Sequence, residues 1–342
     1  MIWVIVLLIL IIIIATLIMS SAQNKKPTIW NEYIAYLRSG QKNRIPHDLA
    51  LQGWNIDAKR FASRNNAVQT IPGFPESSGF PKSRICSWNV HTWKKANGVN
   101  VGAEQIERDI NYINADILCL QEYVNREDIS AVLDKKYPYK VVQLINGSWS
   151  TDFGNAIYSK QPITEKHYLE LPVDPEANEK RICLMARIGN GTDGMWIMNA
   201  HLEVRNSYPN VHKYRYPQLD CILSEANKLQ GRVIILGDFN VGNLSKMDKR
   251  FHQNLKDNGW STPKDAGVIY NNTVYNSNMY GGFVDHIYFR KGETNVYGFY
   301  EYFTDASDHY PVIIDSYNMI MPDMPNMFGT FETEYLTKMK SI

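Results

Sequence analysis

Residues 232–240 read RVIILGDFN, in which four consecutive apolar residues precede a glycine and the polar residues Asp238 and Asn240. A short apolar run rich in β-branched residues is typical of a strand buried on both faces. Groups that follow such a strand lie on a rigid backbone at the rim of the fold, where solvent reaches them. The segment therefore predicts a buried strand with functional side chains at its end.

Similar apolar runs recur on both sides of this segment, and helical patterns separate some of them. The helical periodicity covers residues 103–114 and 214–229. Short buried strands interleaved with helices predict a layered α/β domain. The further predicted strands are RICSW (84–88), DILCL (116–120), NAIY (155–158), MWIMNA (195–200), DHIYF (285–289) and PVII (311–314).

Six of these runs carry an acid, an amide or an imidazole at one end. One asparagine after a strand is an ordinary turn residue. Six polar strand ends in one domain instead predict a shared site, because strand ends meet at the rim of an α/β fold. The residues concerned are Asn89, Glu122, His201, Asp238, Asn240, Asp285, Asp308 and His309.

The residue types form a chemically consistent set. Magnesium prefers hard oxygen ligands, and Glu122 offers a carboxylate while Asn89 offers a neutral oxygen. His309 beside a carboxylate such as Asp285 is an oriented imidazole, and its ordinary pKa near ~6.5 suits proton transfer. Asp238 is suited to hold a water, and no serine or cysteine nucleophile stands out, which favours attack by water. The groups suited to orient phosphate oxygens are Asn240, His201 and Asn89.

Composition sets the outer limits of this interpretation. The chain has 342 residues, a formal net charge of +1 and 21% charged residues, which excludes a fully disordered chain and a strongly basic nucleic-acid coat protein. No CxxC pair is present, so zinc binding by cysteines is not expected. The four cysteines all lie in apolar stretches and are predicted to be buried free thiols: Cys86, Cys119, Cys183 and Cys221.

The N-terminal stretch predicts a membrane anchor. Residues 2–19 contain no charge, and eighteen residues at ~1.5 Å rise span about the thickness of a bilayer's hydrocarbon core. Lys25 and Lys26 follow the stretch, so the positive-inside rule predicts a single-pass anchor with a cytosolic catalytic domain. Small residues at 20–22 leave open the alternative of a cleaved signal peptide and a secreted protein.

Composition shifts divide the chain into four parts. Residues 1–22 are the predicted transmembrane anchor, and residues 23–82 form a juxtamembrane segment with nine basic and four acidic residues, a net charge of +5. Such a charge suits anionic headgroups or a polyanionic substrate. Residues 83–316 hold the predicted catalytic domain, and residues 317–342 form a Met-rich tail.

Several of these segments resemble the endonuclease/exonuclease/phosphatase superfamily, in the same order along the chain. This group includes deoxyribonuclease-I-like nucleases, 5′-tyrosyl-DNA phosphodiesterases and neutral sphingomyelinases. The resemblance implies a four-layer α/β sandwich of two stacked mixed β-sheets flanked by helices, and hydrolysis of phosphoesters that depends on magnesium, with manganese as an alternative ion. The segments are SWNV (87–90), LQEY (120–123), GNAIYSK (154–160), HLE (201–203), GDFN (237–240), VDHIYF (284–289) and SDHYPV (307–312).

The resemblance also implies roles for single residues. Glu122 resembles the principal metal ligand, with Asn89 beside it and Asp308 as an acid near the metal. His309 resembles the catalytic histidine and Asp285 its orienting carboxylate. The other implied roles are a water-activating acid at Asp238, a phosphate-binding amide at Asn240 and a transition-state donor at His201. Asn155 is expected to be either a structural residue or a substrate contact. No motif position carries a disabling substitution, so an active, monomeric enzyme is expected.

Three functions remain open at this point. The first is a nuclease or DNA-end phosphodiesterase, which HLEV followed by RYPQL favours. The second is a sphingomyelinase-like phosphodiesterase of lipid headgroups, which the anchor favours. The third is a tethered binding protein without catalysis. Around the site, Arg215 and Gln218 are predicted to brace it from a helix, and His286 to form a local hydrogen bond.

Overall fold

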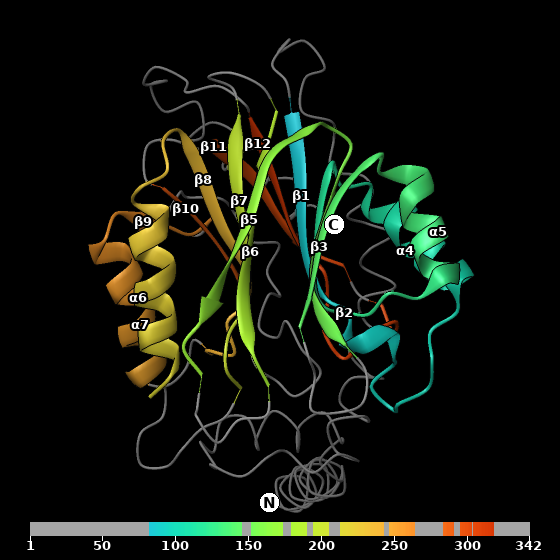
Figure 1. Ribbon diagram of the computed structural model, residues 1–342, viewed down its shortest axis with the longest axis horizontal. Helices are drawn as coiled ribbons and strands as arrows, with labels where there is room; N and C mark the ends of the chain where they lie inside the picture. Colours follow the sequence, from blue (N-terminus) through green and yellow to red (C-terminus); the bar gives the residue numbers. More distant parts are fainter. Residues whose placement is uncertain are drawn as a thin grey trace, which may run out of the picture. The chain divides into compact units, whose positions relative to one another are not determined.

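Two six-stranded sheets lie face to face in the computed structural model (Figure 1). The first sheet has the order β11 (Asn295–Glu301), β12 (Val312–Tyr317), β1 (Lys82–Asn89), β2 (Ile117–Tyr123), β4 (Phe153–Ser159) and β3 (Tyr139–Ile145). The second has the order β5 (Ile163–Leu171), β6 (Arg181–Ile188), β7 (Met195–His201), β8 (Arg232–Asp238), β10 (Asp285–Arg290) and β9 (Trp260–Ser261). The structure describes residues 82–145, 152–173, 179–189, 194–204, 213–242, 246–263, 283–290, 295–302 and 304–317.

Both sheets are mixed, as predicted. In the first sheet β1 and β2 run parallel, and the other neighbouring strands are antiparallel. In the second sheet β7 and β8 form the parallel pair. Parallel neighbours need a crossover connection, and α4 (Ala103–Ile113) and α6 (Arg215–Ala226) provide it. The helices therefore follow from the strand directions.

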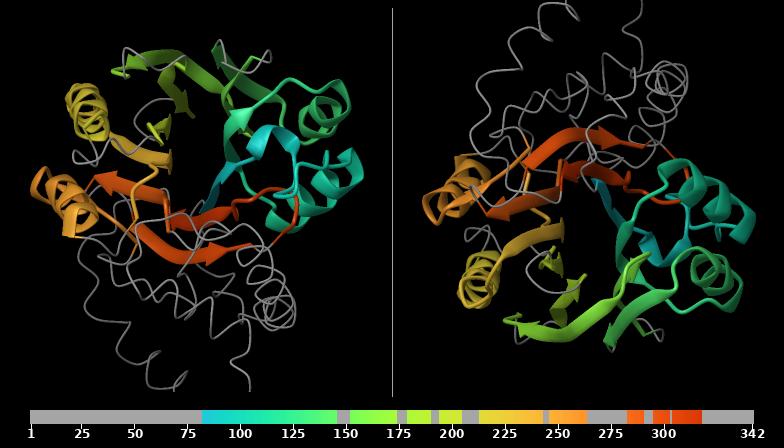
Figure 2. Two further views of the ribbon diagram at one scale, coloured as in Figure 1. Left: turned by 90° about the horizontal axis from the view of Figure 1, so that it is seen from below. Right: turned by 90° about the horizontal axis from the view of Figure 1, so that it is seen from above.

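Helices cover the outer face of each sheet (Figure 2). On the first sheet, α4 and α5 (Glu127–Lys136) pack their apolar residues against the side of β1 that bears Trp88. On the second sheet, α6 and α7 (Lys246–Asp257) pack against the side of β8 that bears Val233. A short 3-10 helix, η2 (His91–Trp93), follows β1. The layers are therefore helix, sheet, sheet and helix.

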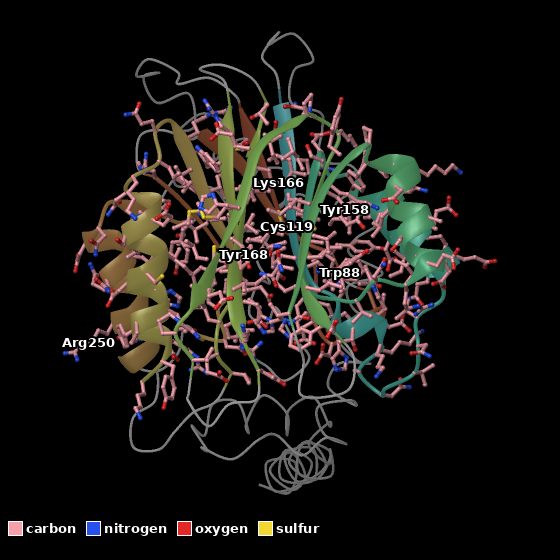
Figure 3. All side chains as sticks on the ribbon, in the orientation of Figure 1. Trp88, Cys119, Tyr158, Lys166, Tyr168 and Arg250 are labelled. Carbon is pink, nitrogen blue, oxygen red and sulfur yellow. The ribbon has the colours of Figure 1, made fainter. Side chains whose placement is uncertain are left out.

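A third apolar core fills the space between the sheets. Alternate strand residues point to opposite faces, so Ile85 and Cys119 face the second sheet, while Ile197 and Ile234 face the first. Figure 3 shows Cys119 among the side chains of this interior, with Trp88 and Tyr158 toward α4 and α5. Because these strands are buried on both faces, their sequences read as continuous apolar runs.

All seven predicted strands and both predicted helices are present. The further elements α5, α7, β3, β5, β6, β9 and β11 are not predicted from the sequence. The reason is visible in β5, an edge strand of sequence ITEKHYLEL that is largely exposed and so carries few apolar residues. In α7, most residues are charged or polar.

Two predicted segments fall almost entirely outside the described residues. They are the anchor with the basic segment over residues 1–82, of which only Lys82 lies within a described strand, and the tail 317–342, of which only Tyr317 does. Within the described part of the chain, no helix is both long and apolar enough to span a bilayer.

Candidate active site

A polar layer continues the apolar core toward one end of the two sheets. In β8, Ile234 and Leu236 face the first sheet, and Asp238 follows on the same face two residues later. In β7, Ile197 is followed in the same way by His201 four residues later. The interior between the sheets thus changes from apolar to titratable side chains, and this change positions the candidate site.

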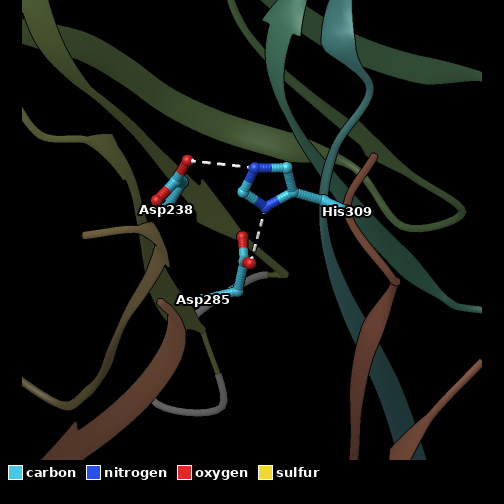
Figure 4. A group of neighbouring side chains, drawn as sticks. All are labelled: Asp238, Asp285 and His309. Carbon is cyan, nitrogen blue, oxygen red and sulfur yellow. Dashed lines mark hydrogen bonds and ion pairs between the residues drawn. The ribbon is translucent and has the colours of Figure 1, made fainter. Parts of the chain in front are cut away.

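His309 connects the two sheets at this layer (Figure 4). It lies just before β12, in the first sheet, while Asp285 and Asp238 are paired residues of β10 and β8 in the second. Nδ1 of His309 lies 2.8 Å from Oδ2 of Asp285, and Nε2 lies 3.7 Å from Oδ2 of Asp238. All three residues are buried. The imidazole is therefore oriented by one carboxylate and directed at another.

Burial and charge shift the pKa values of this group in opposite directions. Burial alone would lower the pKa of His309, but Asp285 and Asp238 outweigh that effect and raise it well above its ordinary value. Burial, together with the charge of Asp285, raises the pKa of Asp238 to about 6. The site therefore holds a positively charged imidazole beside a carboxylate whose pKa of about 6 makes it a stronger base than an ordinary aspartate.

A β-bulge in β2 turns the Glu122 side chain toward the space between the sheets that holds Asp238 and His309. Regular alternation would place Glu122 on the helix-facing side of β2, because Leu118 and Leu120 point there. The pairing of β2 with β4 instead shifts register between Leu120 and Tyr123, and Glu122 has a φ of +52°. A bulge of this kind re-aims a side chain. The Glu122 carboxylate consequently lies within reach of the site.

Asn89 joins this carboxylate to Asp238. Its Nδ2 donates to Oε1 of Glu122 at 3.1 Å and to Oδ2 of Asp238 at 3.0 Å, while its Oδ1 accepts from the backbone N–H of His91 at 2.9 Å. The metal-ligand prediction for Asn89 requires its oxygen, but the amide presents nitrogen to both acids. Asn89 is thus a hydrogen-bonded bridge in this arrangement, and a cation would need the amide to turn round.

The carboxylates of Glu122 and Asp308 are suited to bind a divalent cation. Burial and then the nearby charge of Asp308 raise the pKa of Glu122, as expected for acids that share a site without a counter-ion. Hard divalent cations take such oxygen ligands, so the residues present fit the metal that the sequence predicts. Side-chain ligand atoms of Asp238, Asp285 and His309 also lie within 4.8 Å of one another. There, however, the hydrogen bond between Asp285 and His309 already occupies one atom of each.

His201 lies beside Asp238 on the neighbouring strand of the second sheet. Its Nε2 lies 3.7 Å from Oδ2 of Asp238 and 4.0 Å from Oε1 of Glu122. Arg181, on the neighbouring strand β6, places one guanidinium nitrogen 3.2 Å from Nδ1 and 3.3 Å from Nε2 of the imidazole. Burial, then the charges of Arg181 and His309, lower the pKa of His201 well below its ordinary value. This histidine is therefore neutral, whereas His309 is charged.

Asn240 is held in the turn after β8. It has a φ of +51°, its backbone N–H donates to Oδ1 of Asp238 at 2.8 Å, and its Nδ2 donates to the carbonyl of Leu202 at 3.0 Å. Asparagine tolerates left-handed backbone better than most residues. The turn thus fixes Asn240 beside the acid, as the sequence predicts.

Asn155 lies deeper than the substrate-binding prediction implies. It is buried in β4, and its Nδ2 donates to the carbonyls of Asn199 at 2.9 Å and Ile182 at 3.4 Å, both in the second sheet. These bonds use the donors that a substrate contact needs. Of the two roles expected for Asn155, the structure therefore supports the structural one, a cross-sheet hydrogen bond, and not the substrate contact.

Helix α6 braces the strand that carries His201. Arg215 donates from Nε to the carbonyl of Glu203 at 2.5 Å and from a terminal nitrogen to the carbonyl of Val204 at 2.7 Å. Gln218 accepts from the backbone N–H of Glu203 at 2.9 Å. These contacts confirm the predicted bracing. His286 packs and bonds rather than reaching the site, as expected: its ring lies against those of Phe239 and His252, and its Nε2 lies 2.7 Å from the carbonyl of Val241.

Arg181 and Asn199 were not predicted from the sequence. Asn199 lies within β7 at an inward-facing position, and Arg181 is the first residue of β6, directly before the apolar run ICLMA. The only available signal was a charged or amide residue inside an otherwise apolar strand, which is costly unless it is paired. Arg232 and Arg187 show the same pattern without lying at the site.

Two stacked mixed sheets with an acid and imidazole cluster between their ends define an α/β phosphoester hydrolase. The chain belongs to the Endonuclease/Exonuclease/phosphatase family, whose model matches residues 86–309. Members of this family are metal-dependent phosphoric ester hydrolases, and the chain is an enzyme of that class. The family match sets aside the interpretation as a binding protein without catalysis.

Solved structures share this fold at low sequence identity. An endonuclease/exonuclease/phosphatase from Beutenbergia cavernae is 16% identical, with a TM-score of 0.56 over 69% of this chain and 71% of that one. The human nocturnin catalytic domain with bound sulfate is 18% identical, with a TM-score of 0.55 over 69% and 93%. The Neisseria 3′ phosphatase NExo with product DNA hairpin is 19% identical, with a TM-score of 0.52 over 68% and 98%. No curated protein sequence matches the chain.

Proposed function

We propose that this enzyme is a magnesium-dependent phosphodiesterase in which water attacks phosphorus beside Asp238. One observation carries the proposal: three nitrogen atoms surround a single oxygen, Oδ2 of Asp238. They are Nδ2 of Asn89 at 3.0 Å, and Nε2 of His201 and of His309, each at 3.7 Å. A carboxylate so placed is oriented to take a proton from a bound water, and the imidazoles are placed to donate to the oxygens of a phosphate bound beside it.

Each side chain then has one task. Asp238 accepts the proton of the attacking water, which its raised pKa of about 6 favours near neutral pH. His309, charged and oriented by Asp285, stabilises the negative charge that develops on the phosphoryl oxygens. His201 and Asn240 contribute neutral donors to the same oxygens. Glu122 and Asp308 hold the divalent cation, which supplies Lewis acidity when bound.

Nucleic acid is the proposed substrate, in the form of a DNA or RNA phosphodiester or a modified DNA end. The order of the HLEV and RYPQL segments supports it, and NExo, which shares the fold, was solved with a DNA hairpin. Residues 83–342 carry 27 basic and 31 acidic residues, a net charge of −4. Neutralisation of phosphates by basic side chains dominates the affinity of proteins for duplex nucleic acid. The net negative charge of this part therefore favours a substrate that the enzyme contacts through only a few phosphates.

A lipid headgroup is the second candidate substrate. It is favoured by the apolar residues 2–19 together with the net charge of +5 on residues 23–82. In either case we propose a monomer held at a membrane by residues 2–19, with its catalytic domain in the cytosol. The proposal of the anchor rests on the sequence, since these residues lie outside the described part.

The test uses the full chain in detergent or nanodiscs, with and without magnesium. The substrates are bis-p-nitrophenyl phosphate, a plasmid, a 5′-tyrosyl oligonucleotide and sphingomyelin in mixed micelles, and His309→Ala is the control. Turnover of a nucleic-acid substrate that requires magnesium and is lost in His309→Ala supports the nuclease proposal. Turnover of sphingomyelin alone would replace it with the lipid proposal. Turnover that persists in His309→Ala would contradict the assigned site.

A further inference from the structure

Asn199 crosses the gap between the sheets one layer beneath the site. It lies on β7 two residues before His201 and is fully buried. Its Nδ2 donates to the carbonyl of Leu120 at 2.9 Å and to that of Ala156 at 3.0 Å, and both carbonyls belong to the first sheet. Its Oδ1 accepts from Nε2 of Gln121 at 2.7 Å. Three hydrogen bonds from one amide therefore tie β7 to β2 and β4.

The two carbonyls that Asn199 binds belong to one residue pair, directly beside the bulge in β2. Leu120 and Ala156 are the last paired residues before the register shift, and pairing resumes at Tyr123 and Gly154. A bulge interrupts the ladder and leaves backbone groups without their usual partners. Buried carbonyls need a donor, and the Asn199 amide supplies two at this point. It thereby stabilises the bulged conformation over regular pairing.

Neighbouring side chains keep the Asn199 amide in place. Asn155 of β4 donates to the backbone carbonyl of Asn199 at 2.9 Å, so the two sheets are tied in both directions. Gln121 also donates to Oγ of Ser87 at 3.2 Å, which extends the network to β1. Ser87 lies two residues before Asn89 on the same strand. The network thus underlies the three strands that carry Asn89, Glu122 and His201.

We propose that Asn199 is a positioning residue for the cation site. It stabilises the bulge that directs the Glu122 carboxylate between the sheets, and it contacts neither the cation nor the substrate. Without the amide, regular alternation in β2 turns Glu122 toward the helix-facing side of the sheet. This inference rests on the proposed function, in which Glu122 holds the divalent cation.

The test measures binding of Mn²⁺ alone to the full chain, with free Mn²⁺ followed by electron paramagnetic resonance. Asn199→Leu keeps the side-chain shape but removes all three hydrogen bonds. We expect its Mn²⁺ affinity to fall about tenfold or more, since outer residues that orient metal ligands have effects of this size. If this variant does not fold, Asn199→Ser, which keeps one donor, is measured and should show a smaller loss of affinity.

The matched control is Arg84→Met at the opposite end of β1. Arg84 donates to Oδ1 and Oδ2 of Asp315 at 2.7 and 2.8 Å and to the carbonyl of Ile113 at 3.2 Å, so this change also removes three hydrogen bonds. It should lower the unfolding temperature without changing Mn²⁺ affinity. Equal losses of affinity in the control and in Asn199→Leu would overturn the inference, because they would reflect general loosening of the fold.

A second variant separates this inference from the proposed function. Glu122→Gln should abolish Mn²⁺ binding at the concentrations that saturate the wild type. If it does, and folded Asn199→Leu or Asn199→Ser binds Mn²⁺ as the wild type does, only the positioning role of Asn199 is overturned. If Glu122→Gln itself binds like the wild type, the cation site is misplaced and both proposals fail.

Discussion

Nδ1 of His309 lies 2.8 Å from Oδ2 of Asp285, although the two residues come from different sheets. The hydrogen bond fixes the orientation of the imidazole, so its Nε2 points at Asp238. Asp285 and Asp238 also keep the ring protonated, because together they raise the pKa of His309 against the effect of burial. The geometry of the site therefore depends on how the two sheets are stacked.

Asp285→Asn tests this dependence. The amide keeps the shape of the side chain but removes the negative charge that orients the His309 imidazole and keeps it protonated. We expect kcat to fall at least about 100-fold, the lower range for loss of one preorganised group that stabilises transition-state charge, with little change in KM. Turnover of bis-p-nitrophenyl phosphate measures the effect. A kcat within a factor of ten of the wild type would contradict the role of Asp285.

Magnesium should stabilise the folded protein through the same site. A ligand that binds only the folded state stabilises it by about 2.7 kcal/mol at one hundred times its Kd. We expect magnesium to raise the unfolding temperature of the wild type and to leave that of Glu122→Gln unchanged. Differential scanning calorimetry in EDTA and in excess magnesium measures the shift. Equal stabilisation of both proteins would place the cation elsewhere.

Gly237 precedes Asp238 and should be intolerant of a side chain. Its φ is +137°, and a Cβ there would lie 1.8 Å from the carbonyl oxygen of Ala200 on the neighbouring strand. We expect Gly237→Ala to lower the free energy of unfolding by about 3 kcal/mol or more, because both strain and a backbone clash contribute. Gly102→Ala is the control, since a Cβ at Gly102 meets nothing within 4 Å. Urea denaturation compares the two, and equal stabilities would contradict the close approach of β7 and β8.

The four thiols should differ in reactivity. Burial raises the pKa values of all four thiols, but Cys86, Cys119 and Cys183 are fully covered, whereas Cys221 is half-buried and accessible to a reagent. Because the thiolate is the reactive form, we expect one thiol per native chain to react with a disulfide reagent and all four to react in denaturant. Rapid reaction of more than one native thiol would contradict the packing of the sheets. Loss of the reactive thiol in Cys221→Ser identifies it.

The sequence predicted most of the strands that are buried on both faces, because their apolar runs are continuous, but it did not predict β6, which is equally buried. It also predicted the polar ends of β7, β8 and β10, since Asp238, Asp285 and His201 continue the inward-facing alternation. It did not reveal why Glu122 faces the site, because the bulge in β2 breaks that alternation through contacts with the other sheet. Arg181 was missed for a similar reason: its partner, His201, lies on the neighbouring strand β7. Long-range pairing of this kind leaves no local pattern.

Hydrolysis of bis-p-nitrophenyl phosphate by Asp238→Asn, beside the wild type and with magnesium present, tests the central claim most directly. The substituted amide keeps the size of the side chain but replaces one acceptor oxygen with a donor, and it cannot take up the proton of the attacking water. We expect the wild type to turn over only with magnesium, and Asp238→Asn to lose kcat by about 100-fold or more while remaining folded. A folded Asp238→Asn enzyme that retains activity within a factor of ten would show that water is activated elsewhere.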